Sequence, residues 1–297
     1  MRRLALALGL SLLCATVRAD EDESPLVWLR RIRAPVDVGA FGWVGGSSPR
    51  DVVVHVATRS DPIGWRSHLA FAQLASRLGV DHVPHTELRR LGLGDLLAAG
   101  RGDPFTHGWL DAEALALGDG RVRAVVVDRP AGRRVDWPDG PDAASARGWA
   151  RGGDGDEVRG VAWVETVVLD YLAGAVRRHD ALIAADGHVW LADNRGAMHE
   201  RPEPRSLDRL LSRVQEVRRF PTKLVEGLQS YDHDAALAQG RRGAAVDWCV
   251  GEREISDVDD RRRTVLSLVA ARVAERGQGE VVAPWGEARV PPGSESR

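Results

Sequence analysis

The sequence is poor in cysteine, and this limits how its fold can be held together. It has two cysteines. Cys14 lies in an N-terminal segment that we expect to be removed, which leaves Cys249 alone. One thiol cannot form an internal disulfide, so packing must hold the fold together even in an oxidising compartment. Cys249 follows Trp248 in an apolar run, which favours a buried, inert thiol over a reactive one.

Lysine is scarcer still. Lysine and arginine together number 41, but Lys223 is the only lysine. Any chemistry that needs an ammonium group earlier in the chain is therefore excluded. The formal net charge is −2, which gives no overall attraction to nucleic acid or to an anionic membrane. We therefore expect no nucleic-acid partner.

Long hydrophobic runs are also missing. The longest, residues 4–17, follows Arg2 and Arg3 and precedes a small-residue cleavage site at residues 17–19. It is shorter than the roughly 20 apolar residues that span a bilayer. The pattern predicts a signal peptide over residues 1–19 rather than a buried N-terminal helix. We expect an exported protein, secreted or held in the secretory-pathway lumen (or the periplasm, if bacterial), without a membrane span.

The rest of the sequence predicts strands first and helices later. Residues 51–57 and 121–129 are β-branched and apolar, as in buried strands. Between them, residues 69–78 have helical spacing before Gly79. Residues 138–156 are rich in Gly, Asp, Ala and Pro and predict a flexible insert. Four segments complete the pattern: a buried helix at 157–175, a hairpin at 181–191, a helix at 206–228 broken at Pro221, and an amphipathic helix at 255–276.

Four segments, in this order, resemble the four-jointed and Golgi casein kinase family of secretory-pathway kinases. HLAFAQLASRLGVDHVP begins at His68, and WVETVVLDYLAGAVRRHD begins at Trp163. HVWLADNRGAM begins at His188, and the last segment is the pair VRRFPTKLVEGLQ and DVDDRRRTVLSLVAARVAERG. Each segment is weak alone because apolar helices are common, but their order and spacing carry the resemblance.

The resemblance implies a two-lobed α+β fold like that of an atypical protein kinase. The kinase-like domain would span residues 20–277, with a strand-rich N-lobe at about 26–134 and a helical C-lobe at about 157–277. We expect a disordered tail over 278–297. The implied cofactors are ATP with Mg²⁺ or Mn²⁺, unless the site has lost them.

The family's strand lysine, which contacts the ATP phosphates, and the helix glutamate that pairs with this lysine correspond here to His55 and His68. Imidazole is mostly neutral near pH 7 and shorter than a lysine stem. Both members of the ion pair are therefore replaced together. A buried strand residue is the simplest interpretation of His55, while a metal site formed by the two histidines remains an alternative.

On the C-lobe, the family's catalytic aspartate corresponds to Arg177, which cannot accept a proton. Arg178 matches a neighbouring motif position near the nucleotide. Asp180 could act as the catalytic carboxylate after a loop shift, or it could be a turn residue. Asp193 matches the metal-binding aspartate, or else forms a turn with Asn194. Asp170 is expected to be buried and to need Arg177 or Arg178 as a partner.

These matches favour an exported pseudokinase that acts through a protein partner, because most catalytic positions are replaced. The first alternative is an active protein or glycan kinase in which Arg59 or Arg66 holds phosphates, Asp193 the metal and Asp180 the acceptor. The second is an extracellular binding protein only remotely related to kinases. His82 and His85, three residues apart, predict a surface turn rather than a metal site.

Overall fold

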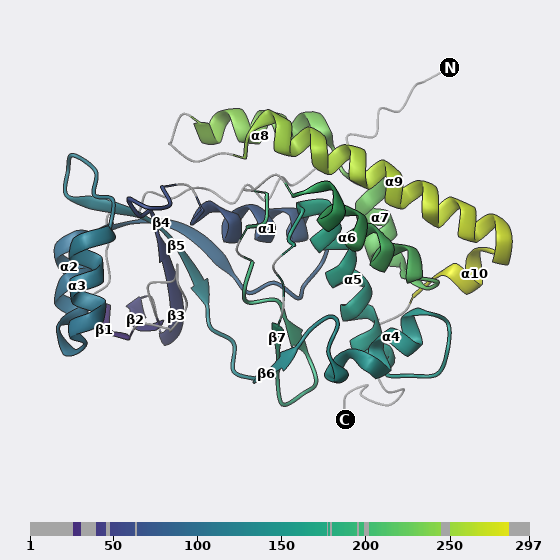
Figure 1. The fold of residues 1–297 in the computed structure, drawn as a ribbon, viewed down its shortest axis with the longest axis horizontal. Coiled ribbons are helices and arrows are strands. Elements are labelled where there is room, and N and C mark those ends of the chain that lie inside the picture. The colour runs from purple at the N-terminus through teal and green to yellow at the C-terminus, as the bar shows by residue number, and fades with distance from the viewer. Residues whose placement is uncertain are drawn as a thin grey trace, which may run out of the picture.

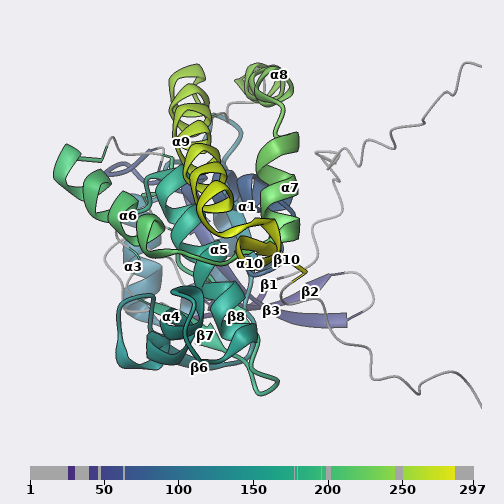
Figure 2. The same cartoon turned by 90° about the vertical axis from the view of Figure 1, so that its right-hand side faces the viewer.

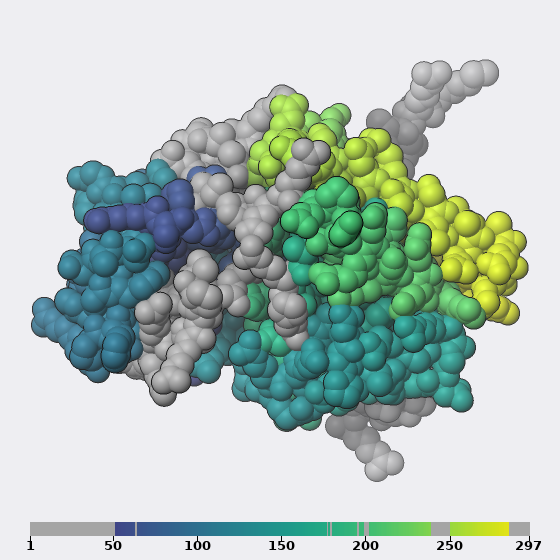
Figure 3. Space-filling model, viewed as in Figure 1, coloured from purple at the N-terminus to yellow at the C-terminus, as the bar shows by residue number. Residues whose placement is uncertain are grey.

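The computed structural model describes residues 26–30, 40–45, 48–62, 64–176, 178, 180–194, 196–198, 202–244 and 250–284. The predictions for the signal peptide, Arg177 and Cys249 lie outside these residues. Within them the chain forms the two-lobed α+β fold that was expected, with α2 and α3 at one end of the molecule and α9 and α10 at the other (Figures 1 and 3).

The small lobe is built on a five-stranded antiparallel sheet of order β1-β2-β3-β5-β4. Its strands are β1 (Leu26–Arg30), β2 (Ala40–Gly45), β3 (Ser48–Val56), β4 (Thr86–Gly92) and β5 (Arg121–Asp128). The two predicted strands are thus β3 and β5, which pair directly. Sequence reasoning missed β4, whose side chains are mostly half-buried and show no clear alternation.

Helices cover both faces of this sheet, because alternate residues of β3 and β5 point to opposite sides. Val54 and Val126 pack on one side with residues of α2 (Leu93–Ala99) and α3 (Pro104–Glu113). Val125 and Val127 pack on the other side with Trp65 and Leu69, at the start of α1 (Arg66–Arg77). Gly79, just after α1, has φ 69° and fits the predicted helix end.

The large lobe surrounds α5 (Glu157–Ala173), in which every residue from Gly160 to Ala173 is buried. The Asp156 side chain caps its first turn, and Gly174, with φ 64°, ends it. Around it lie α6 (Pro204–Glu216), α7 (Thr222–Ser230) and α9 (Glu252–Arg276), with α8 (His233–Ala244) beside α9 (Figure 2). A three-stranded sheet of order β6-β7-β8 completes the lobe: Arg133–Asp136, Asp180–Ile183 and Val189–Trp190.

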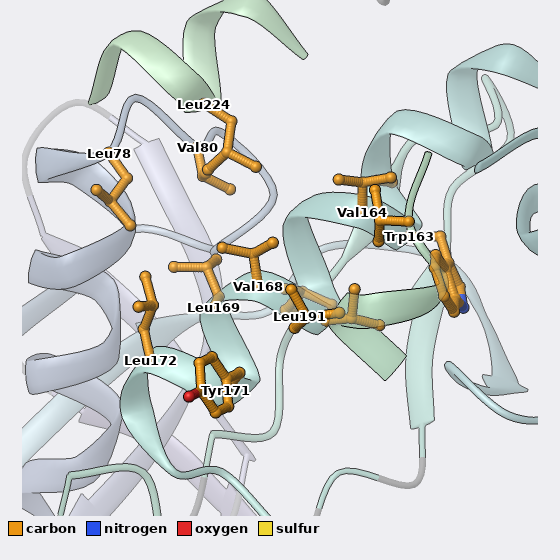
Figure 4. Packing of buried hydrophobic residues seen from close by; sticks show 14 of the residues in the cluster. Leu78, Val80, Trp163, Val164, Val168, Leu169, Tyr171, Leu172, Leu191 and Leu224 are labelled. Atoms are coloured by element: carbon orange, nitrogen blue, oxygen red, sulfur yellow. The ribbon is translucent and has the colours of Figure 1, made fainter. Parts of the chain in front are cut away.

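One hydrophobic core joins the two lobes. Phe71 and Leu74 of α1, with Leu78 and Val80 of the loop after it, belong to the same buried cluster as α5. Figure 4 shows Leu78 and Val80 facing α5 and α7. The helix that covers the small sheet is therefore fixed to the large lobe as well.

Two predicted irregular segments have more structure than expected. The proposed insert at 138–156 contains a short 3-10 helix (Pro141–Ala143) and α4 (Ala144–Ala150). Ala146, Trp149 and Ala150 are buried there at helical spacing. The Trp149 ring lies so close to Gly160 that a Cβ on Gly160 would be 2.3 Å from it. The Gly- and Asp-rich composition of this segment therefore predicted a flexible insert where a packed helix is present.

The predicted tail also begins in ordered structure. Residues 278–283 form α10 (Gln278–Val281) and β10 (Val282–Ala283), which pairs in parallel with β9 (Phe220–Pro221). Val281 is fully buried, which explains the order. The boundary between the lobes also shifts, because β6 pairs with β7 of the large lobe and the change of lobe falls after β5 rather than at residue 134.

Candidate functional site

His55 and His68, the positions matched to the family's lysine and glutamate, lie against each other. His55 is on β3, opposite Val125 and on the face that α1 covers. His68 is in the first turn of α1. Their rings are stacked, with centroids 3.6 Å apart and planes 19° apart. Only 6% of His55 and 1% of His68 are exposed. The strand and helix therefore meet where the resemblance places an ion pair.

This stack supports neither a phosphate-binding cation nor a shared metal ion. The lone pairs of an imidazole lie in the plane of its ring, so two stacked rings do not point their nitrogens at one ion. In the described part of the chain, no group of three or more His, Cys, Asp and Glu residues could hold a metal ion. The metal-site alternative for His55 and His68 is thus not favoured by their geometry.

Arg178 forms the most extensively bonded charged cluster of the site. Its Nε donates to both carboxylate oxygens of Asp170, at 2.8 and 2.9 Å. One terminal nitrogen donates to the Asp193 carbonyl at 2.9 Å, and the other to Oδ1 of Asn194 at 2.7 Å. The guanidinium also lies 5.1 Å from the centre of the Phe71 ring on α1. Arg178 therefore connects α1, α5 and the segment that follows β8.

These contacts give Arg178 a structural role. Its side chain is 1% exposed, and its nitrogens donate to groups inside the protein. Its assignment as a nucleotide-binding residue stays a prediction. Asp170 has the partner that its burial predicted. Burial acts to raise the pKa of Asp170, and the Arg178 guanidinium opposes this effect.

Asp193, the matched metal ligand, follows β8 in a segment fixed at its backbone. Its carbonyl accepts from Arg178, and the buried Asn194 beside it donates from Nδ2 to the Leu191 carbonyl at 2.9 Å. A partly buried carboxylate here could serve as one metal ligand. The described residues supply no group of three His, Cys, Asp or Glu side chains around it. Asp193 therefore stays the candidate for a single protein ligand to a metal ion.

Asp180, the proposed substitute for the catalytic aspartate, is the first residue of β7. The hairpin pairs Leu182 with Trp190, so Asp180 and Asp193 lie at the same open end of it. The Asp180 carboxylate, however, forms a close ion pair with Arg134 of β6. Asp180 is therefore neither a solvated turn residue nor a carboxylate without a partner.

The two arginines of the active-kinase alternative lie at the edge of the small lobe. The backbone amide of Arg59 donates to the Glu113 carbonyl at the end of α3, at 2.8 Å. The Arg66 guanidinium lies 5.6 Å from the centre of the Trp65 ring. The Arg59 backbone therefore contacts the end of α3, and the Arg66 side chain lies beside Trp65 at the start of α1.

Sequence reasoning missed a second buried cluster, centred on His82. Its Nε2 lies 3.0 Å from Glu165 of α5, and its Nδ1 lies 2.9 Å from the Val189 carbonyl. The His82 side chain is 12% exposed, so the prediction of a surface turn is wrong for it, whereas His85 is 63% exposed and fits that prediction. A glutamate inside an apolar helix was the available signal, because a buried carboxylate needs a partner.

No membrane-spanning helix is present in the described ranges, where none is both long and apolar enough. No family model matches the chain, and no curated protein matches it in sequence.

Solved structures do match over most of the chain. A hydra Fam20 structure with sugar has a TM-score of 0.62 and 13% identity, and the match covers 87% of this chain and 88% of that one. A Golgi casein kinase structure has a TM-score of 0.60 and 12% identity, covering 88% and 76%. The Golgi casein kinase with Mn/ADP bound has a TM-score of 0.60 and 12% identity, covering 90% and 78%.

These values confirm, at the level of the fold, the resemblance that the four sequence segments indicated. The chain has the two-lobed α+β fold of the Golgi casein kinase and of hydra Fam20.

Proposed function

We propose that this chain is an exported pseudokinase, a kinase-fold protein that does not transfer phosphate and acts by binding a partner protein. The observation that carries the proposal is the buried stack of His55 on His68. It occupies the strand and helix positions that the resemblance assigns to the lysine and glutamate of the ATP site.

The physical reason is electrostatic. Phosphoryl transfer proceeds mainly by positioning the triphosphate and stabilising its charge with fixed cations and metal ions. An imidazole offers neither the permanent charge nor the long stem of a lysine. The sole lysine, Lys223, lies on α7 and pairs with Asp81 at 2.6 Å.

The remaining charges are already used inside the protein, which also supports the proposal. Arg178 is occupied by Asp170, Asn194 and the Asp193 carbonyl. Asp180 is held by Arg134. A proton-accepting carboxylate that must first leave an arginine is poorly placed to orient an acceptor hydroxyl, because catalysis depends on small displacements.

The N-terminal segment supports export, since residues 1–19 have the pattern of a signal peptide. One of the matching proteins is, by its name, a Golgi kinase. Both observations favour residence in the secretory-pathway lumen or outside the cell, or in a periplasm if the source is bacterial.

An active phosphotransferase is the second candidate, because the hairpin places Asp180 and Asp193 at one end and a matching structure holds Mn/ADP. It requires Asp180 to exchange Arg134 for an acceptor, and Arg59 or Arg66 to reach the phosphates. A related binding protein without a kinase fold is not favoured, because the two-lobed fold is present.

The deciding experiment is a phosphate-transfer assay on the purified mature chain with ATP and Mn²⁺. It should use protein and glycan acceptors, with a Golgi casein kinase as the positive control. We expect no transfer above that of Asp193→Ala. Robust transfer by the wild-type chain that Asp193→Ala abolishes would reverse the proposal in favour of an active kinase.

A further inference from the structure

His82, from another part of the chain, contacts the free edge of the strand that leads to Asp193. One edge of β8 pairs with β7. On the other side, the His82 carbonyl accepts from the Leu191 amide at 2.7 Å, and His82 Nδ1 lies 2.9 Å from the Val189 carbonyl. His82 belongs to the loop between α1 and β4, so it links the small-lobe helix to the segment that contains Asp193.

The partners of His82 determine its protonation. The Val189 carbonyl can only accept, so Nδ1 must carry a hydrogen. In a neutral imidazole, Nε2 would then present a lone pair to the Glu165 carboxylate, 3.0 Å away. Two acceptors do not attract at this distance, so a proton must lie between them. The geometry is that of an imidazolium donating from both nitrogens.

Loss of the proton between His82 and Glu165 is unfavourable because it would leave the Glu165 carboxylate without this hydrogen bond. It lies in the buried part of α5, where its side chain is 7% exposed. Among the described residues, His82 is the partner that satisfies it. A buried carboxylate without its partner is strongly unfavourable, typically by about 3–5 kcal/mol when one member of a buried pair is removed.

The loop that carries His82 is embedded in the large lobe. Leu78 and Val80 are buried in its core (Figure 4). Gly227 of α7 is so close that a Cβ would lie 2.4 Å from the Leu78 carbonyl oxygen. Asp81 is bound by Lys223. A change at His82 is therefore passed to α1, which is covalently attached to this loop.

The charged and titratable groups around His82 come from each neighbouring element in the described chain. Glu165 comes from α5, and Asp81 is on the same loop and paired with Lys223 of α7. His188 precedes β8, with its ring centroid 4.6 Å from that of His82, and Asp186 lies in the β7–β8 turn beside His188. Of these, only Glu165 shares a proton with His82.

From this geometry we infer that protonated His82 is a positioning residue that locks β8, and with it the Asp193 segment, to helix α1. The lock opens when the imidazolium loses a proton, because a neutral ring can donate to the Glu165 carboxylate or to the Val189 carbonyl but not to both. This inference does not depend on whether the protein transfers phosphate, because it concerns the coupling between α1 and the Asp193 segment rather than turnover.

The test is amide hydrogen exchange on the full mature chain at about pH 6 and about pH 9, corrected for intrinsic exchange. At the higher pH we expect the wild-type amides of residues 189–194 to exchange about tenfold faster or more, as one charged hydrogen bond is lost. The β3–β5 strand pair should not change.

Glu165→Gln is the informative variant. A Gln amide donates to neutral His82 Nε2 while Nδ1 still donates to the Val189 carbonyl, so the contact no longer needs the shared proton. We expect residues 189–194 of this variant to keep their protection at both pH values. His82→Ala should lose it at both, and His85→Ala, at an exposed neighbour, should behave as the wild type.

Two results would overturn the inference without bearing on the proposed function. One is equal protection of residues 189–194 in the wild type at both pH values. The other is a Glu165→Gln variant as sensitive to pH as the wild type. Since Glu165→Gln preserves the hydrogen bond and the volume of the side chain, the test remains decisive even where His82→Ala does not fold.

Discussion

Two buried side-chain clusters lie at positions matched to kinase residues, and they differ in the charged groups that they contain. Between β3 and α1, a stack of two histidines, His55 and His68, occupies the positions of the family's ion pair. Near the end of α5, Arg178 donates from Nε to both carboxylate oxygens of Asp170 and makes two further hydrogen bonds. The positions matched to the ATP-site lysine and glutamate hold histidines, while the buried pair of Asp170 and Arg178 is present.

The largest expected effect is at the retained cluster. Asp170→Ala removes the carboxylate that neutralises Arg178 and leaves a buried guanidinium. We expect it to lower the free energy of unfolding by about 3–5 kcal/mol, measured by urea denaturation. Glu216→Ala, which breaks the exposed pair with Arg151, is the matched control and should cost at most about 1 kcal/mol. Equal losses in the two variants would remove the distinction between the clusters.

At the histidine stack, we expect His55→Lys to be tolerated better when it is combined with His68→Glu. His55→Lys alone places an ammonium against the buried His68 ring, and we expect a loss of about 1–3 kcal/mol, limited because the long stem can reach toward water. Adding His68→Glu should recover part of this, with a favourable coupling energy of about 0.5–3 kcal/mol. A double-mutant cycle measured by urea denaturation gives this coupling directly. Zero coupling would mean that the two positions do not form the pair that the fold implies.

The smallest effect concerns acid sensitivity at His188. Burial lowers the pKa of His188, and the nearby His82 lowers it further. Because the unfolded chain binds this proton more readily than the folded one, stability is complete above the ordinary histidine pKa of about 6.5 and falls as the pH drops below it.

His188→Gln should therefore reduce part of the loss in unfolding free energy between neutral and mildly acidic pH, measured by denaturant titration at each pH. His85→Gln, at an exposed histidine, is the control and should leave the pH profile unchanged. A steeper acid loss in His188→Gln than in the wild type would contradict this assignment.

Local sequence patterns predicted much of the fold. The β3 and β5 strands, α1, α5, the β7–β8 hairpin and α9 follow from runs of apolar residues with the right period. The Asp170–Arg178 pair was also predictable, since a carboxylate in the last turn of a buried helix needs a partner and Arg178 follows soon after the helix ends. The meeting of His55 and His68 came from the resemblance rather than from any local pattern.

The parts that could not be predicted depend on contacts between distant segments. His82 and Val189 are separated by 107 residues, and nothing near His82 in the sequence indicates that partner. Helix α4 could not be predicted because its burial depends on the close contact between the Trp149 ring and Gly160, which has no side chain. Arg134 holding Asp180 likewise needed the β6–β7 pairing, which no motif encodes.

The central claim is that no fixed cation binds a triphosphate beside β3. The most direct test compares the thermal unfolding midpoint of the mature chain with and without saturating ATP and Mn²⁺. A ligand at 100 times its Kd stabilises a protein by about 2.7 kcal/mol, which is readily detected as a shift. The account predicts an unchanged midpoint for the wild type. A rise in the wild-type midpoint that Asp193→Ala removes would contradict it.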